Sequence, residues 1–364
     1  MRDKTRNKVF LVLSVYPIFI LSLILISILP DKYFYDNNRI LSMVTGSGVM
    51  QSWEGSYRFA ADLFVKIDVF NLTTVNQWHL LIGVTFNVII VYLLLSGRDT
   101  NTIETIYLLA GIVLANIYTF TIGKDVIQFC LFFAIYMIIA SNRLTVNIKT
   151  ILVTAILLSE GFYFKAYYFL IGCFFIGCFF LLKRTRYNLK KTFLIILVSI
   201  FLIMTILFIC SKSFYMQIAS IRYSINLGRE SSMDARTAIN DLILPQIANN
   251  NPILLIVNYC INALRLMIPL ELLTKGVYYI PFFLFQVLTA CFVYRYAKKC
   301  ICQRKITDIL FFSVYIGFFL CSVFFEPDFG SWVRHEISIF PILIQAVYYS
   351  LLPDVATGSV KGTK

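Results

Sequence analysis

A short polar stretch near the C-terminus holds the densest set of groups that could do acid–base chemistry. EPDFGSWVRHE, residues 326–336, contains three acids, one arginine and one of only two histidines, and it lies between two strongly apolar runs. Charged side chains near membrane depth are costly and tend to mark function. Because a carboxylate or an imidazole can take a proton from a hydroxyl group, Asp328, His335 and Glu336 are candidate catalytic residues. A solvated loop held by salt bridges is the alternative.

Basic residues in other polar segments could hold an anionic group. Arg222, Arg229 and Arg236 are spaced seven residues apart and would share one face of a helix, although a glycine and two serines between them argue against one continuous helix. A guanidinium group suits a phosphate because its planar fork donates two parallel hydrogen bonds and keeps its charge. IGKDV sets Lys124 and Asp125 between two apolar runs, where a simple solvated turn is the alternative.

The whole chain has the composition of a membrane protein. Hydrophobic residues make up 59% of the 364 residues and charged residues only 14%, and the mean hydropathy is +0.79. Apolar runs recur from end to end and leave no room for a separate soluble domain. We therefore expect one all-α transmembrane domain over residues 1–364. Its N-terminal run is about 20 residues long without a small-residue cleavage site, so we interpret it as a retained first span.

Ten apolar runs are long enough, or nearly so, to cross a bilayer. A crossing helix needs about 20 apolar residues, and somewhat fewer where neighbouring helices shield it. Two long polar segments, 30–79 and 211–275, separate some of these runs. The predicted spans are 9–29, 80–95, 103–122, 126–140, 148–158, 166–182, 192–210, 277–293, 309–325 and 337–352.

Charge is distributed unevenly between the two sides of these spans. With the N-terminus in the cytosol, the inner connections hold 19 of the 32 basic residues and five of the 19 acidic residues. The outer segments then hold 13 basic and 14 acidic residues, which is the positive-inside pattern of a correctly oriented membrane protein. Both termini are therefore expected in the cytosol. The segments 30–79 and 211–275 become two large outer loops, and the candidate residues above face outward.

An eleventh apolar segment, 252–273, is predicted to lie in the membrane interface or to re-enter the membrane. If it crossed the bilayer, the basic loop YRYAKKCICQRK would lie outside, which is the costlier arrangement. Asn251 followed by proline is a good helix start. Asn258, Asn262 and Arg265 then fall on one face and form a polar stripe on an apolar helix.

No segment has the marks of a nucleotide-binding, metal-binding or nucleic-acid-binding domain. Neither GxxxxGK[ST] nor GxGxxG after a strand is present, and the positive charge follows the membrane topology, so we expect no nucleic-acid partner. Cys300 and Cys302 form a C-x-C pair in a predicted polar loop without a second pair, which is weak support for zinc. We therefore expect no metal and no cofactor.

The polar and apolar segments follow one another in a characteristic order. After the first span come a mixed polar and aromatic outer loop (WEGSYRFAADLF), a GKD turn, an aromatic YYFLIG helix and an arginine-bearing outer loop, and then NALRLMIPLELL and GSWVRHE before the last helix. This layout resembles that of bacterial polysaccharide repeat-unit polymerases, the Wzy and EpsG-like group of O-antigen and capsule pathways. The similarity covers most of the chain and lies in layout more than in individual residues. The ligase signature of a histidine followed by a distant glycine and glutamate is absent.

The resemblance implies a glycosyltransferase. It would move a growing glycan from undecaprenyl pyrophosphate onto a sugar hydroxyl of an incoming lipid-linked repeat unit, at the outer face of the bacterial inner membrane, with a chain-length regulator as an expected partner. By analogy, His335 or Glu336 would be the base and Asp328 a further catalytic candidate. The residues expected to bind the pyrophosphate are Arg222, Arg229, Arg236, Arg265 and Arg334, together with Lys124 and Asp125.

Two other functions remain open. A multi-spanning glycosyltransferase that uses a polyprenyl-phosphate sugar typically keeps a catalytic acid in its first outer loop, where Asp31 or Asp36 would serve; replacing each by Asn should inactivate that enzyme and spare a polymerase. A flippase or exporter of lipid-linked sugars usually shows internal repeats and charges at mid-membrane, and the sequence shows neither clearly. Loss of a polymerase should leave single repeat units on the surface lipid, whereas loss of a transferase or flippase should remove the glycan.

Overall fold

A computed structural model of the chain describes residues 2–164, 166–230 and 237–350. Within these ranges the fold is helical, and the only β interaction is an isolated bridge between Ala238 and Asp328. The expected all-α membrane fold is confirmed, since eight helices among the described residues are long and apolar enough to cross a membrane. They are α1 (Arg2–Ile28), α4 (Val75–Ser96), α5 (Thr102–Leu114) with its π-helical continuation η2 (Ala115–Thr119), α7 (Val146–Tyr163), α8 (Phe169–Arg184) with the preceding turn η3 (Ala166–Tyr168), α9 (Leu189–Cys210), α13 (Ile280–Gln303) with the preceding turn η6 (Val277–Tyr279), and α14 (Ile306–Phe325).

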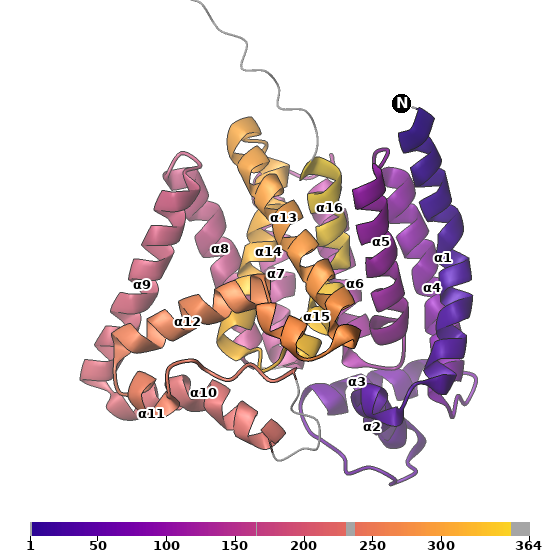
Figure 1. The fold of residues 1–364 in the computed structure, drawn as a ribbon, viewed down its shortest axis with the longest axis horizontal. Helices are drawn as coiled ribbons and strands as arrows, with labels where there is room; N and C mark the ends of the chain where they lie inside the picture. The colour runs from indigo at the N-terminus through magenta and orange to yellow at the C-terminus, as the bar shows by residue number, and fades with distance from the viewer. Residues whose placement is uncertain (1, 165, 231–236, 351–364) are drawn as a thin grey trace, which may run out of the picture.

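Two of the ten predicted spans form shorter helices. α6 (Lys124–Ala140) has 17 residues and α16 (Phe340–Ser350) has 11 residues, whereas a helix that crosses a bilayer by itself needs about 20. Both run along the long helices in Figure 1. Eight of the ten predicted spans therefore coincide with helices long and apolar enough to cross a membrane, and α6 and α16 are shorter than that.

The two ends of the helix bundle differ in character (Figure 1). The upper end, which we refer to as the basic end, holds the N-terminus and the short connections 97–101, 141–145, 185–188 and 304–305. The lower end, which we refer to as the loop end, holds α2 (Tyr35–Thr45), α3 (Ser56–Ile67), α10 (Lys212–Glu230), α11 (Pro245–Ala248), α15 (Phe329–Ser338) and the short turns η1 (Asp31–Phe34), η3 (Ala166–Tyr168), η5 (Leu270–Thr274) and η6 (Val277–Tyr279). The segments predicted to face the cytosol thus share one end, and those predicted to face outward share the other.

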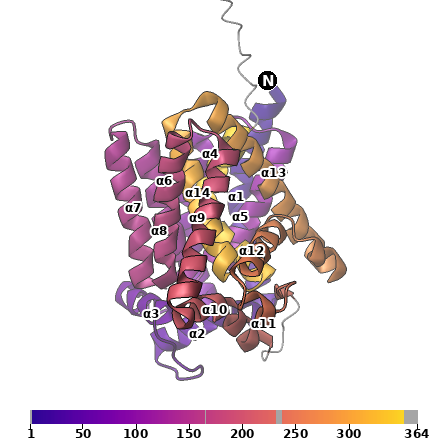
Figure 2. The ribbon, with the colours of Figure 1, turned by 90° about the vertical axis from the view of Figure 1, so that its left-hand side faces the viewer.

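α12 (Pro252–Met267) lies obliquely to the long helices, near the loop end (Figures 1 and 2). Asn251 caps its first turn by accepting hydrogen bonds from two backbone amides, as the sequence predicts. Its polar stripe faces protein, because Asn262 donates to Asp241 at 2.8 Å and Arg265 donates to the carbonyl oxygen of Asn240 at 2.7 Å. The stripe therefore fastens the segment that precedes α11 onto the bundle.

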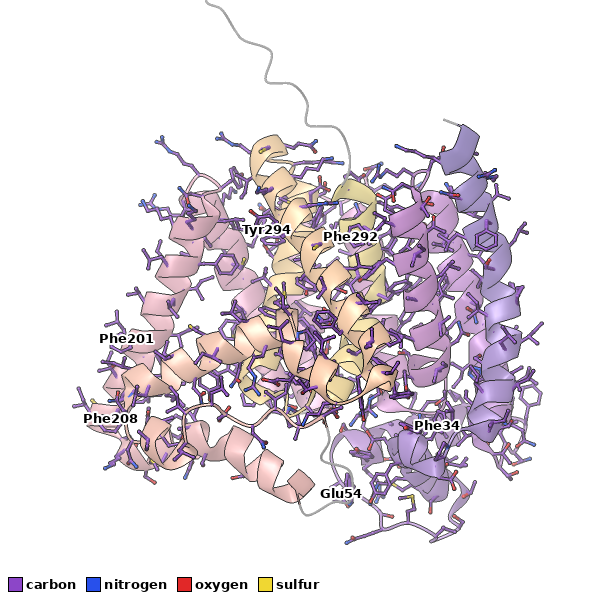
Figure 3. All side chains as sticks on the ribbon, viewed as in Figure 1. Phe34, Glu54, Phe201, Phe208, Phe292 and Tyr294 are labelled. Atoms are coloured by element: carbon purple, nitrogen blue, oxygen red, sulfur yellow. The ribbon has the colours of Figure 1, made fainter. Side chains whose placement is uncertain are left out.

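The long helices differ in how deeply they are buried. α14 lies at the centre, with 89% of its span buried, whereas only 11% of α9 is buried. α8 packs closely on α14 at Gly317, where a β-carbon would lie 2.7 Å from a carbonyl oxygen and 2.9 Å from an amide nitrogen of the α8 backbone. Along the outer edge of α9, Phe201 and Phe208 mark an apolar flank (Figure 3). This flank suits contact with lipid tails.

One predicted loop is helical. α13 continues to Gln303, so the segment expected to form a basic loop is a helix except for its last two residues. Tyr296, Ala297 and Cys300 are buried at helical spacing and pack one face of the extension against the bundle, while the charged residues between them misled the sequence-based prediction. The cysteine pair accordingly lies on a helix, with Cys300 buried and Cys302 exposed.

Candidate functional site

The polar stretch 326–336 forms most of the short helix α15 instead of a solvated loop. Asp328 caps the helix: one carboxylate oxygen accepts the backbone N–H of Ser331 at 2.6 Å and the other accepts its hydroxyl at 3.0 Å. Trp332 is wholly buried and donates its indole N–H to the carbonyl oxygen of Leu266 on α12 at 3.1 Å. The cap and this anchor fix α15 at the loop end, so its polar side chains have defined directions.

Helices far apart in the sequence bring one carboxylate and two cations together. Asp36 on α2 accepts a hydrogen bond from Arg334 on α15 at 2.8 Å and lies 3.4 Å from the ammonium of Lys124 on α6. Tyr57 on α3 donates its hydroxyl to the other oxygen of Asp36 at 2.6 Å. We refer to Asp36, Tyr57, Lys124, Arg334 and their neighbour Asp125 as the ionic cluster.

Arg334 joins the two acids of this cluster. Its Nε atom lies 3.2 Å from Asp125, while its Nη2 atom binds Asp36. The predicted turn residues Lys124 and Asp125 are the first two residues of α6. Asp125 is well placed there, since the start of a helix favours negative charge. The structure therefore assembles three of the predicted anion-site residues, and it pairs the cations with carboxylates.

The cluster shifts the pKa values of its own members. Burial alone would raise the pKa of the Asp36 carboxyl, but the charges of Arg334 and Lys124 and the hydrogen bond from Tyr57 together lower it well below its ordinary value. Burial and the neighbouring Asp36 carboxylate raise the pKa of Tyr57. Asp36 is therefore ionised and Tyr57 protonated at neutral pH, which fixes the direction of the hydrogen bond between them.

His335 lies beside the ionic cluster, next to a small cavity. Its Nδ1 atom is 2.9 Å from a carboxylate oxygen of Glu326, and its Nε2 atom is 3.9 Å from an oxygen of Asp125. The cavity has a volume of about 10 Å³, enough for roughly one water-sized group, and we refer to it as the His335 cavity. It is lined by Ser56, Lys124, Asp125, Gln128, Phe164, Tyr168 and His335.

The other two predicted catalytic residues lie elsewhere. Glu336 is fully buried and accepts a hydrogen bond from the hydroxyl of Tyr315 on α14 at 3.0 Å. It does not line the His335 cavity. The oxygens of Asp328 hold the N-terminus of α15. Of the three candidates, only His335 faces the cavity next to the ionic cluster.

Of the remaining predicted arginines, the structure describes the side chain of Arg265 alone. Arg265 pairs with Glu271 at 2.6 Å. Arg222 and Arg229 lie on α10, which runs through Gly228 to Glu230, so the glycine does not break the helix and the positions of the two residues fall on one helical face. Arg236 lies outside the described residues.

Several members of the site were missed or misassigned from the sequence. Asp36 was considered only as an acid for a rival enzyme, Glu326 only as one of the charged residues of the polar stretch, and Tyr57 was not singled out. Glu326 carried a local signal, since it lies nine residues before His335 in the same polar stretch. Tyr57 carried none, because its role depends on contacts with α2 and α6.

The assembled groups suit a polyhydroxylated or anionic substrate. Around the His335 cavity, the carboxylate of Asp125, the hydroxyl of Ser56 and the amide of Gln128 can exchange hydrogen bonds with a hydroxyl group. Arg334 and Lys124 can add charge-assisted hydrogen bonds to a phosphate. Comparison of the chain with protein-family models, curated proteins and solved structures finds no match in any of the three.

Proposed function

We propose that the chain is a polymerase of undecaprenyl-pyrophosphate-linked oligosaccharide repeat units, of the O-antigen or capsule type. The observation that carries the proposal is the ionic cluster with His335 beside it, built by α2, α3, α6 and α15 at one end of a bundle of membrane-type helices. A lipid carrier holds its pyrophosphate and sugars at the membrane surface. A polar site at the end of the bundle lies where such a head group is presented.

In this proposal the loop end faces the periplasm or the cell exterior. The short connections at the basic end then lie in the cytosol, in agreement with the positive-inside rule. α6 and α16 complete ten crossings, shielded by their neighbours, and both termini are cytosolic. The protein is then a multi-pass protein of the bacterial inner membrane, and its site opens to the side on which complete repeat units are joined.

The pyrophosphate would bind near the two cations of the ionic cluster. Asp36 holds both Arg334 and Lys124, so an incoming pyrophosphate competes with this carboxylate for them. The arginines of α10 and of the segment after it, Arg222, Arg229 and Arg236, would contribute further charge, with Arg265 on α12 as an additional candidate. Guanidinium groups suit this task because they bind two phosphate oxygens at once.

Glycan gels of a gene-deletion strain test the proposal. The deletion should leave single repeat units on the surface lipid, and the intact gene should restore the polymer ladder. Arg334→Ala should fail to restore it, whereas the control Arg58→Ala should succeed, because Arg58 at the same end pairs with Asp62 and both side chains are 59% exposed. Immunoblots of the membrane fraction are the control that both variants accumulate. A normal ladder with Arg334→Ala, or complete loss of glycan on deletion, counts against the polymerase.

One observation favours a second candidate function, a multi-spanning glycosyltransferase that uses a polyprenyl-phosphate sugar. Asp36, an acid of the first outer segment, lies at the centre of the ionic cluster. Because Asp36 holds both cations, replacing it by Asn would disturb either enzyme, and that replacement alone does not separate them. Isolated membranes do: a polymerase elongates complete lipid-linked repeat units, whereas the second enzyme adds one sugar from a polyprenyl-phosphate sugar.

A further inference from the structure

We propose that Glu326 and His335 form a carboxylate–histidine dyad that deprotonates the acceptor hydroxyl, and that the His335 cavity holds the oxygen of this hydroxyl. The inference rests on the proposed function and deepens it, because it assigns a positioning role to Glu326 and a binding place to the attacking group.

The contact with Glu326 fixes which ring nitrogen of His335 carries the proton. In the dyad Glu326 is ionised and can only accept hydrogen bonds, so the Nδ1 atom of the imidazole donates to it across 2.9 Å. In the neutral ring the Nε2 atom then carries the lone pair. Glu326 is buried, with 5% of its surface exposed, and it directly precedes the extended turn into α15 that Asp328 caps. The carboxylate therefore orients the ring from a fixed position.

The Nε2 atom is the one available to a substrate. It is buried and makes no hydrogen bond among the described residues, and its ring lines the His335 cavity. The nearest oxygen of Asp125 is 3.9 Å away, too far for a hydrogen bond. A cavity of about 10 Å³ matches one hydroxyl oxygen. A sugar hydroxyl placed there would lie between Nε2 and the polar groups of Ser56 and Gln128.

The charges around the ring suit a base that gains a proton during the reaction. Glu326 faces Nδ1 and Asp125 faces Nε2, so a protonated imidazole lies between two carboxylates. Lys124 and Tyr168 also line the cavity, and Arg334 offsets part of the charge of Asp125. The two carboxylates can stabilise the positive charge that the ring gains in the transition state.

The transfer step forms one glycosidic bond and breaks one bond to pyrophosphate. The acceptor oxygen forms a bond to the anomeric carbon of the growing glycan while its proton moves to Nε2 of His335. The bond between that carbon and the pyrophosphate oxygen breaks, and its electron pair leaves with undecaprenyl pyrophosphate. The imidazolium then releases its proton to solvent. His335 touches the reacting hydroxyl and is the catalytic residue, and Glu326 acts through it.

Elongation assays in isolated membranes of the deletion strain test the dyad, with the lipid-linked repeat unit extracted from that strain as the probe. His335→Gln should lower the elongation rate by about 100-fold or more, and Glu326→Gln should lower kcat by about tenfold or more with little change in KM. The double variant should be no slower than His335→Gln alone, because the two residues act as one unit. Glu54→Gln, an exposed acid at the same end, is the control.

The pH profile separates this role from a purely structural one. Removing the negative charge of Glu326 makes the imidazole harder to protonate, so the acid limb of the rate profile should move to lower pH in Glu326→Gln. The position of that limb does not depend on how much protein reaches the membrane. If wild-type membranes elongate nothing, the proposed function fails and the dyad with it. Two results with active wild-type membranes would overturn the dyad alone. One is an elongation rate of Glu326→Gln equal to that of Glu54→Gln. The other is a double variant whose loss of rate equals the product of the two single losses.

Discussion

Replacing Asp36 with asparagine should destabilise the folded protein by about 3 kcal/mol. Asparagine keeps the shape of the side chain but removes the charge that holds Arg334 and Lys124. Asp125, which pairs with Arg334, is then the one carboxylate left in the ionic cluster. Removing one partner of a buried ion pair costs about 3–5 kcal/mol. Because the Asp36 side chain is 18% exposed, we expect a cost at the lower end of this range.

This loss should appear as a lower melting temperature in detergent. Unfolding entropy of about 2.1 cal/mol/K per residue over 364 residues converts 3 kcal/mol into a fall of about 4 °C. Asp62→Asn is the matched control, because its pair with Arg58 is 59% exposed on both sides and such pairs contribute about 1 kcal/mol or less. A thiol-reactive dye reports unfolding, since three free cysteines are buried in the folded protein, namely Cys178, Cys300 and Cys321.

The same pair of variants gives the expected pH dependence. The folded state lowers the pKa of Asp36 below the ordinary 3.8, so its contribution to stability is complete above that pH and is lost as the pH falls through and below it. The difference in melting temperature between wild type and Asp36→Asn should therefore be constant above about pH 5 and become smaller below about pH 4. Equal melting temperatures of Asp36→Asn and Asp62→Asn at pH 7 would refute the energetic role given to the ionic cluster.

Three further predictions test the fold and its orientation. Gly317→Ala should destabilise the protein by about 1–3 kcal/mol, because its β-carbon meets the α8 backbone; Gly177→Ala, with nothing within 4 Å, should be neutral or stabilising in the same melting assay. Asp328→Ala should cost about 1 kcal/mol through loss of the α15 cap, and an unchanged melting temperature would contradict that role. In a cysteine-free background, an impermeant maleimide should label Asp62→Cys in intact cells and a restored Cys302 only after permeabilisation; the reverse pattern would overturn the topology.

Local sequence patterns predicted the elements better than their ends. Hydropathy located all eight long helices, since a run of apolar residues has one stable form in a bilayer. Charge misled the prediction at the end of α13, where Tyr296, Ala297 and Cys300 continue the buried face beside basic residues, of which Lys299 is itself buried. Long basic side chains can extend to the membrane surface from a continuing helix, so a cluster of lysines and arginines alone does not mark a helix end.

The ionic cluster could be predicted only as a set of charges at one side. Buried charges at that end must be paired to be tolerated, and the outer segments hold 13 basic and 14 acidic residues, which allow many pairings. Arg334 meets Asp36 across 298 residues of sequence. Nothing local distinguishes this partner from Asp31 in the same segment, because the choice depends on how α2 packs against α6 and α15.

The orientation of Glu336, in contrast, is contained in the sequence once residues 329–338 are taken as a helix. Phe329, Trp332, Val333, Glu336 and Ile337 follow at i, i+3, i+4, i+7 and i+8, and all five are buried. Helical spacing thus places Glu336 on the apolar face and turns its two predecessors, Arg334 and His335, toward the ionic cluster. A carboxylate on that face meets Tyr315 and not the cavity. Under the proposed function, helical periodicity alone therefore favours His335 over Glu336 as the base, because His335 shares the face of Arg334 and Glu336 lies on the buried face.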